Sequence, residues 1–405
     1  MQRGSVLRQA MDAGAVYPSS LYVHIPFCRA KCAYCDFNSY AGLDDLHVPY
    51  MEALGKEMAQ YGARWAGVPL RTIYIGGGTP TTLPFALLAR LLEACHRHFH
   101  VLSEAEITIE ANPGTVNRPT LAGLRQQGVT RLSLGVQSLD DRMLHVLGRI
   151  HTANQAVDTY LTARDVGYDN INIDLIYGLP GQSLAEWQRT LEDALALAPD
   201  HLSLYALTLH EETPLAREIR RGAWPALDDD LAADMYTWAL HELETNGYRH
   251  YEISNWAAKR KLRSGHIEED YALCHHNLTY WLDKPYIGLG AGAHSYLEQR
   301  RYWNKTYPED YIRCLWVGQS PVEGEEAIDR ATEMAEVMIL GLRLMEGVSY
   351  ERFAARFGCD LRDIYRNALG SLEGLGLLHV GPECVRLTER AYLLGNEVFE
   401  RFLPG

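Results

Sequence analysis

The alternation of short strand-forming runs with helix-periodic segments most restricts how this 405-residue chain can fold. Runs rich in β-branched and aromatic residues predict strands at Leu21–Ile25, Arg71–Ile75, Glu106–Glu110, Arg131–Val136, Asn170–Tyr177 and His201–Ala206. Helical periodicity between them predicts helices at Pro49–Trp65, Pro84–Phe99, Pro119–Gln127, Asp140–Leu147, Asn154–Val166 and Leu184–Leu197. This order predicts parallel βαβ units, which could form an open barrel or a doubly wound sheet. The runs read as apolar on both faces, as in a parallel sheet covered by helices.

Polar residues gather where five of these predicted strands end. They are the cysteine-containing loop after the first strand, Gly76–Pro80 after the second, Glu110 and Asn112 at the third, Gln137 and Ser138 at the fourth, and Asp174 and Tyr177 in the fifth. The carboxyl ends of the strands of a parallel barrel share one rim, and active sites lie at that rim. The sequence therefore predicts a functional site there.

Three of the eight cysteines are clustered, because Cys28, Cys32 and Cys35 follow a C-x3-C-x2-C spacing. Thiolates are soft ligands that select zinc, copper(I) or iron–sulfur clusters. A closed zinc site needs a fourth ligand, and His24 is the only nearby candidate. Three thiolates on a four-iron cluster would leave one iron open to a substrate or cofactor. A zinc loop completed by a distant residue stays an alternative.

Charge and hydropathy argue against a nucleic-acid-binding, membrane-spanning or secreted protein. Lys and Arg total 38 against 52 Asp and Glu, giving a formal charge of −14, which disfavours a nucleic-acid partner. No stretch approaches the ~18 apolar residues that a membrane span needs. The first 20 residues lack the apolar core of a signal peptide. We expect a cytoplasmic protein.

The pattern changes after about residue 324. Helices are predicted at Ala327–Leu344, Tyr350–Phe357 and Leu361–Leu375, followed by a hairpin of Leu377–Val380 and Cys384–Leu387. Three helices and a hairpin predict a winged-helix-like domain. Residues 325–405 carry 9 Arg and no Lys against 14 acidic residues, so a packing or lid role is favoured over DNA binding.

The cysteine spacing with Tyr34, the Gly-Gly-Gly-Thr-Pro loop and the later Glu-Ala-Asn-Pro segment resemble the radical S-adenosylmethionine (SAM) superfamily. The segments SLGVQS, GRIH and NINIDLIYGLPG narrow the resemblance to the branch of oxygen-independent coproporphyrinogen III oxidase and the haem chaperone group HemW. The resemblance runs from about Leu21 to Leu403. It implies an α/β fold, a partial (β/α)6 radical SAM barrel with a C-terminal winged-helix-like domain.

The resemblance implies roles for individual residues. Cys28, Cys32 and Cys35 match the ligands of a [4Fe-4S] cluster, whose open iron would bind SAM. The positions that match SAM or cluster contacts are Tyr22, Tyr34, Gly77, Gly78, Thr79, Glu110, Gln137, Arg149 and Asp174. Catalytic residues stay unassigned, although the fold implies the potential to cleave SAM.

Two departures favour the chaperone over the oxidase. The oxidase pattern has a further cysteine where this chain has Phe37, and only 27 residues precede Cys28 where the oxidase has a longer segment. The expected function is a haem chaperone that passes haem to an acceptor protein and receives electrons from a donor. The alternative is the oxidase, which would decarboxylate coproporphyrinogen III to protoporphyrinogen IX.

A positive signal for haem lies further along the chain. His276, Asn277, Tyr280 and Trp281 match the H-N-x-x-Y-W motif of the chaperone group, and an imidazole can ligate haem iron. The neighbouring Cys274 and His275 are rival ligands. The expected domains are therefore a 1–20 extension, a 21–324 barrel with extension strands and this haem motif, and the 325–405 domain.

Overall fold

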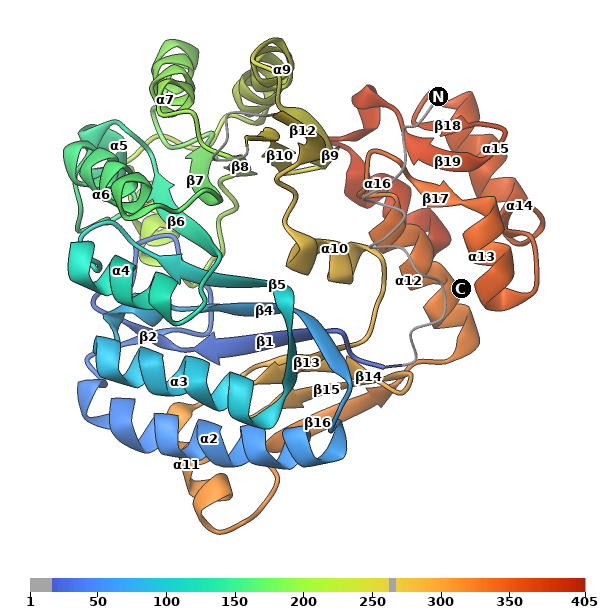
Figure 1. Ribbon diagram of the computed structural model, residues 1–405. Coiled ribbons are helices and arrows are strands. Elements are labelled where there is room, and N and C mark those ends of the chain that lie inside the picture. Colours follow the sequence, from blue (N-terminus) through green and yellow to red (C-terminus); the bar gives the residue numbers. More distant parts are fainter. Residues whose placement is uncertain (1–16, 262–266, 405) are drawn as a thin grey trace.

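The computed structural model describes residues 17–261 and 267–404, and its centre is a 12-stranded sheet (Figure 1). Six neighbouring strands of that sheet are parallel and follow chain order: β1 (Ser20–Ile25), β4 (Pro69–Gly77), β5 (His100–Ala111), β6 (Arg131–Gln137), β7 (Ile171–Tyr177) and β8 (His201–Ala206). A doubly wound sheet reverses its strand order at a switch point, and this one does not. After β8 the sheet continues into the antiparallel β10 instead of returning to β1, so the barrel is open. The six predicted strands and the partial barrel are confirmed.

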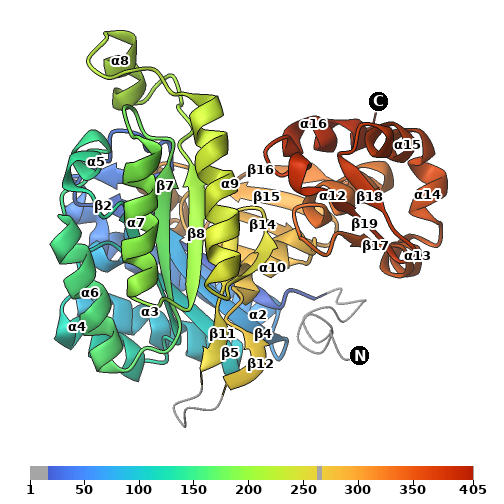
Figure 2. The ribbon, with the colours of Figure 1, turned by 90° about the horizontal axis from the view of Figure 1, so that it is seen from above.

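Helices cover the outer face of the parallel strands (Figures 1 and 2). They are α2 (His47–Arg64), α3 (Phe85–His98), α4 (Arg118–Gln126), α5 (Asp141–Val146), α6 (Ala153–Val166) and α7 (Leu184–Ala196). Outward side chains such as Ile73, Leu132 and Ile173 are fully buried in the core that these helices share with the sheet. The alternate side chains of the same strands point inward and are mostly polar, as at Tyr74, Glu110 and Asp174. The expectation of strands apolar on both faces is therefore wrong for the inner face, which carries polar side chains such as Thr108, Ser133 and Asn172.

The sheet extends beyond the barrel on both sides. On one side β13 (Tyr286–Leu289) runs parallel to β1, and β14 (His294–Leu297), β15 (Arg300–Asn304) and β16 (Val322–Ala327) continue antiparallel. On the other side lie β10 (Asn255–Ala257) and β9 (Arg249–Glu252). The domain boundary expected at residue 324 falls inside β16, so the change of architecture comes after Ala327.

The remaining elements of this part of the chain connect or flank the sheet. They are α8 (Pro214–Arg220), α9 (Asp229–Thr245), α10 (His275–Trp281), α11 (Pro308–Trp316) and the hairpin of β11 (Lys259–Lys261) and β12 (Ile267–Tyr271). Residues 1–16 of the expected N-terminal extension lie outside the described residues. None of the helices in the described part of the chain is long and apolar enough to cross a membrane.

The C-terminal unit has a core of its own and lies beside the barrel (Figure 2). Its elements are α12 (Arg330–Gly341), β17 (Val348–Ser349), α13 (Tyr350–Phe357), α14 (Leu361–Ile364), α15 (Arg366–Gly374), β18 (Leu378–Val380), β19 (Cys384–Leu387) and α16 (Gly395–Phe399). The three strands pair in the order β17-β19-β18, and the predicted hairpin is present. The third predicted helix is two helices, because Tyr365 leaves helical geometry at φ −108° and ψ 22°.

Candidate functional site

The three clustered cysteines lie on one pinned loop at the carboxyl end of β1. Cys28 ends β2 (Phe27–Cys28), which pairs with β3 (Tyr40–Ala41), so the two ends of the loop lie side by side. The backbone N–H of Cys35 donates to the carbonyl of Cys32, which tightens the turn between them. All three thiols are free and partly exposed. The pairing of β2 with β3 thus holds the three cysteines close together at the predicted rim.

Each thiol has a polar neighbour. The guanidinium of Arg149 donates to Sγ of Cys32 at 3.2 Å. The hydroxyl of Thr79 lies 3.6 Å from Sγ of Cys28, and that of Ser39 lies 3.9 Å from Sγ of Cys35. Burial raises the pKa of Cys28 and of Cys35, because a buried thiolate loses its hydration. These sulfurs would ionise most readily with a positive centre beside them.

The glycine loop after β4 faces the cysteine loop at a distance that excludes side chains. A Cβ on Gly78 would lie 2.7 Å from the carbonyl oxygen of Phe27 and 3.1 Å from Sγ of Cys28. A Cβ on Gly77 would meet the ring of His24, and its φ of 116° is one that glycine adopts without strain. Here glycine is needed for a close approach and not only for a turn.

Two carboxylates lie inside the barrel next to the glycine loop. Glu110 accepts hydrogen bonds from the backbone N–H of Gly77 at 3.0 Å and from the hydroxyl of Tyr74 at 2.8 Å. Burial and, to a lesser degree, the negative charge of Asp174 raise its pKa to about 7. Asp174 accepts from Asn172 at 2.8 Å and from Ser133 at 3.2 Å, and burial raises its pKa as well. The pair would favour a cationic group in the space between them.

Arg149 joins several parts of the rim. One of its nitrogens donates to the side chain of Asn112 and to the carbonyl of Gly135, both at 2.6 Å. Another reaches Cys32, and its Nε is buried without a partner among the described residues. Gln137 lies in the same region with a left-handed φ of 66°, a conformation that is rare for a residue other than glycine.

The two predicted tyrosines have different surroundings. The hydroxyl of Tyr22 lies 2.8 Å from Nδ1 of His24, and its ring stacks on Tyr74 with centroids 6.3 Å apart. Tyr34, on the cysteine loop, packs with a small apolar cluster that includes Met143 and Leu147. Tyr22 therefore faces the barrel interior, whereas Tyr34 anchors the loop to its neighbours.

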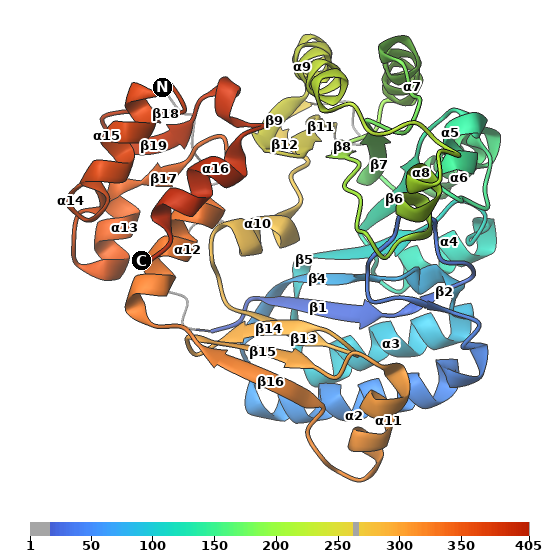
Figure 3. The same ribbon diagram turned by 180° about the vertical axis from the view of Figure 1, so that it is seen from behind.

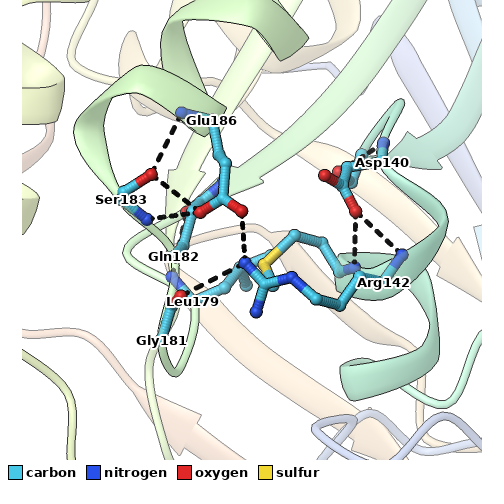
Figure 4. A network of polar contacts seen from close by, with 9 residues as sticks. Asp140, Arg142, Leu179, Gly181, Gln182, Ser183 and Glu186 are labelled. Atoms are coloured by element: carbon cyan, nitrogen blue, oxygen red, sulfur yellow. Dashed lines mark hydrogen bonds and ion pairs between the residues drawn. The ribbon is translucent and has the colours of Figure 1, made fainter.

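The loops after β6 and β7 are tied together behind this rim (Figure 4). The guanidinium of Arg142 donates to Glu186 and to the carbonyl of Gly181 at 3.3 Å. Glu186 also completes a capping box with Ser183 at the start of α7, and these hydrogen bonds hold its pKa near 2, well below the usual range. This network fixes the positions of the two loops relative to each other.

Three thiols on one loop are a soft donor set, which suits an iron–sulfur cluster. Within the described residues, no three His, Cys, Asp or Glu side chains converge closely enough to hold one metal ion. A cubane cluster takes each thiolate on a different iron, so its ligands need not converge on a point. The buried Nε of Arg149, which has no partner among the described residues, leaves one donor at this rim for a ligand. His24 has both ring nitrogens engaged, with Tyr22 and with the carbonyl of Asn38.

The haem-motif residues lie apart from the cysteine loop, on α10. His276 is only 1% exposed, and its Nδ1 lies 2.8 Å from the hydroxyl of Thr72 while its Nε2 lies 2.9 Å from that of Tyr280. Burial lowers its pKa to about 3. In this conformation the imidazole offers no free nitrogen to an iron. The rival Cys274 is fully buried, with a pKa raised to about 12 by burial.

The end of the motif is more open. Trp281, the last residue of α10, is partly exposed, and Asn277 is partly exposed as well. The guanidinium of Arg343 lies over the Trp281 ring, 4.4 Å from its centroid. The motif therefore combines a buried imidazole with a partly exposed indole.

Asn112 is a site residue to which the sequence assigned no role. Its side-chain amide donates to the hydroxyl of Thr79 at 2.7 Å, and its oxygen accepts from Arg149. It thus links the glycine loop to the arginine that contacts Cys32. The signal was its position two residues after Glu110, at the end of the third strand.

Comparisons with known proteins agree with this geometry. Residues 22–194 match the family described as the radical SAM superfamily, and residues 328–394 match the HemN C-terminal domain. The haem chaperone HemW of Bacillus subtilis is 36% identical over 95% of this chain and 99% of its own length. That of Lactococcus lactis is 36% identical over 95% of this chain and 97% of its own. The solved coproporphyrinogen III oxidase HemN of Escherichia coli shares the fold, with a TM-score of 0.82 at 24% identity, over 98% of this chain and 92% of its own.

Proposed function

Because the chain belongs to the radical SAM superfamily and, within it, to the haem chaperone HemW family, we propose that it binds haem and delivers it to an acceptor protein. We also propose that it carries a [4Fe-4S] cluster and SAM. The observation that carries the cofactor proposal is the pinned loop of three free thiols facing a glycine loop at the mouth of a parallel barrel.

Cys28, Cys32 and Cys35 would hold the cluster. The loop is fixed at both ends by β2 and β3, which holds the three thiols near one another. Arg149 would balance charge at Cys32, and the hydroxyls of Thr79 and Ser39 would solvate the other two sulfurs. When bound, the cluster and SAM would supply one-electron chemistry, with electrons from a donor protein.

The groups opposite the thiols would bind SAM. The amino group of SAM suits Glu110 and the backbone of the loop at Gly77 and Gly78, because a carboxylate attracts an ammonium group. The other proposed contacts in the same region are Tyr22, Tyr34, Thr79, Gln137, Arg149 and Asp174.

We propose haem binding from the family and from the α10 motif. Since both nitrogens of His276 are hydrogen-bonded, ligation by His276 would require α10 to rearrange. Tyr280 and Trp281 would then contact the porphyrin, with Asn277 beside them.

The oxidase reaction is the second candidate. It is favoured by the presence of Gln137, Arg149 and Asp174 in one region, since the resemblance places these residues at SAM in the oxidase. Against it stands Phe37, which is 66% exposed on the cysteine loop where the oxidase pattern has a cysteine.

Anaerobic reconstitution separates the candidates. The reconstituted protein, reduced and supplied with SAM, is incubated with coproporphyrinogen III in one arm and titrated with haem in the other. We expect haem to co-elute with the protein in gel filtration and the porphyrinogen to remain. Stoichiometric conversion to protoporphyrinogen IX would overturn the chaperone proposal in favour of the oxidase.

A serine variant tests the cluster ligands. Cys32→Ser should abolish the brown absorbance of the reconstituted protein, because an alcohol is a poor ligand for iron in such clusters. Cys384→Ser, which changes a partly exposed thiol in the C-terminal unit, is the matched control. Unchanged absorbance in Cys32→Ser would show that the ligand assignment is wrong.

A further inference from the structure

A large cavity lies between the barrel and the C-terminal unit, away from the cysteine loop. Its volume is about 790 Å³, within the range of roughly 300–1,000 Å³ that is usual for cofactor and small-molecule sites. The end of α10 and the loop that leads into β13 form one wall, and α12, β17 and α13 form the other. Figure 3 shows α10 between the sheet and the C-terminal unit, and α10 is in contact with α12 of that unit.

The walls of the cavity offer apolar and aromatic surface. Trp281 and Tyr296 contribute rings from the barrel side, and Val337, Val348 and Phe353 contribute apolar groups from the C-terminal side. The indole Nε1 of Trp281 is buried and lacks a hydrogen-bond partner among the described residues. Such walls suit a flat apolar body, because an aromatic face stacks on another.

Three acidic and three basic side chains line the same cavity, and most of them are already paired. Arg356 donates to Asp283 at 2.7 Å and to Glu333 at 2.6 Å, and Glu298 pairs with Arg64. Lys284 is also engaged.

Arg352 is the exception. Its guanidinium makes no hydrogen bond or ion pair within the described part of the chain, although the side chain is partly buried and lines the cavity. Burial lowers its pKa and the nearby Arg356 adds to this shift, while Glu346, which forms an ion pair with Arg249, opposes it. A partly buried, unpaired guanidinium is costly unless an anion completes it.

We propose that this cavity binds the haem cargo, with a propionate on Arg352 and the macrocycle on the face of Trp281. The proposal rests on the proposed haem-binding function and places it at a site distinct from His276. Haem combines a flat apolar ring with two carboxylates, which is the combination that the aromatic walls and the single unpaired guanidinium complement.

The residues that line the cavity determine which features of a ligand it can recognise. None of the described residues that line it is Cys, His or Met, and burial raises the pKa of the lining Tyr296, so that its phenol resists the deprotonation that ligation of haem iron needs. Binding there would depend on the carboxylates and the ring and not on the iron. Metal-free protoporphyrin IX should therefore bind about as well as haem, and haem dimethyl ester should bind at least about tenfold more weakly.

Two variants of the full-length protein test the site by quenching of tryptophan fluorescence. Arg352→Gln removes the cation, and Ala355→Trp fills the cavity from an exposed position on α13 where it should not disturb the core. The matched control is Arg366→Gln, which neutralises an exposed arginine of the same unit outside the cavity. We expect Arg352→Gln and Ala355→Trp each to raise the Kd for haem about tenfold and Arg366→Gln to leave it unchanged.

The outcomes separate this inference from the function beneath it. Wild-type affinity for haem in both Arg352→Gln and Ala355→Trp would overturn the cavity assignment while leaving the chaperone proposal intact. Loss of binding in His276→Ala together with failure of metal-free porphyrin to bind would also overturn it, in favour of ligation through iron. Absence of haem binding to the wild-type protein would overturn the proposed function, and this inference with it.

Discussion

Gly78 shows how a single absent side chain can shape the site. Its neighbours leave no room for a methyl group, which would lie 2.7 Å from the carbonyl oxygen of Phe27 and 3.1 Å from Sγ of Cys28. Gly78→Ala should therefore displace the cysteine loop and lower the iron retained after anaerobic reconstitution by at least about half. The measurement is iron per chain in the desalted protein.

The control for that prediction is Gly55→Ala on α2. Nothing lies within 4 Å of a Cβ at Gly55, and alanine favours helix by up to about 1 kcal/mol over glycine. Gly55→Ala should retain full iron and unfold at slightly higher urea. Equal iron content in Gly78→Ala and wild type would contradict the proposed close approach.

Individual residues also show what sequence reasoning reaches. Gly77, Thr79 and Glu110 were predicted at the rim because they lie where strands end, and the structure brings them together. Arg149 was expected only from the family resemblance, and it joins them through Asn112. The hydrogen bond between His276 and Thr72 could not be predicted, because the two residues lie 204 positions apart in the chain. Whether a polar residue is free or satisfied depends on such distant contacts.

At the scale of elements, Glu57 joins α2 to the extended part of the sheet. Its buried carboxylate accepts from the hydroxyl of Tyr311 at 2.6 Å, from the side chain of Asn304 at 2.7 Å and from the backbone N–H of Gly290 at 2.9 Å. Glu57→Gln would present an amide N–H₂ group to one of these donors. We expect a loss of about 2 kcal/mol in the free energy of unfolding, measured with urea.

Glu52→Gln serves as the comparison, because Glu52 is exposed on the same helix. It should change the free energy of unfolding by no more than about 0.5 kcal/mol. If Glu57→Gln were equally neutral, the carboxylate would not be holding the helix to the sheet.

Some elements could be predicted from their own sequence, whereas others depend on contacts with distant parts of the chain. The parallel strands of the barrel were predictable because one whole face is apolar and β-branched. The strand β16 was not, because its sequence, VEGEEA, is largely exposed and polar, and it forms only by pairing with β15. The split of the third C-terminal helix at Tyr365 likewise has no signal from proline or glycine.

At the scale of the whole molecule, His250 lies where the sheet edge meets the C-terminal unit. Its ring stacks on Trp256 at 4.4 Å and meets the edge of Tyr392 at 5.2 Å. Burial lowers its pKa to about 4, below the unfolded value of about 6.5. The unfolded chain therefore binds more protons between these values, so this contribution to stability is complete above about pH 6.5 and is lost as the pH falls toward 4.

Removing that imidazole should make the free energy of unfolding less dependent on pH. Between pH 7 and pH 5, His250→Gln should lose roughly 2 kcal/mol less free energy of unfolding than the wild type does. The exposed His241→Gln on α9 should retain the wild-type slope. If the free energy of unfolding changed equally with pH in wild type and His250→Gln, burial of this histidine would not contribute to the pH dependence of stability.

Arg356 connects the two cores through charge. It reaches from α13 to Asp283, whose side chain is 5% exposed, and to Glu333 on α12. Arg356→Ala would leave two carboxylates without their cation, and we expect a loss of about 2–3 kcal/mol in the free energy of unfolding. Arg366→Ala, at an exposed ion pair, should cost less than about 0.5 kcal/mol. Equal urea midpoints for the two variants would contradict this role.

The metal content of the intact protein tests the central claim most directly. The chain is purified and reconstituted without oxygen, and iron, acid-labile sulfide and zinc are measured per chain. The account predicts iron and sulfide in equal amounts, about four of each, and no stoichiometric zinc. One zinc per chain with neither iron nor sulfide would contradict it, because the three thiols would then serve a closed structural site.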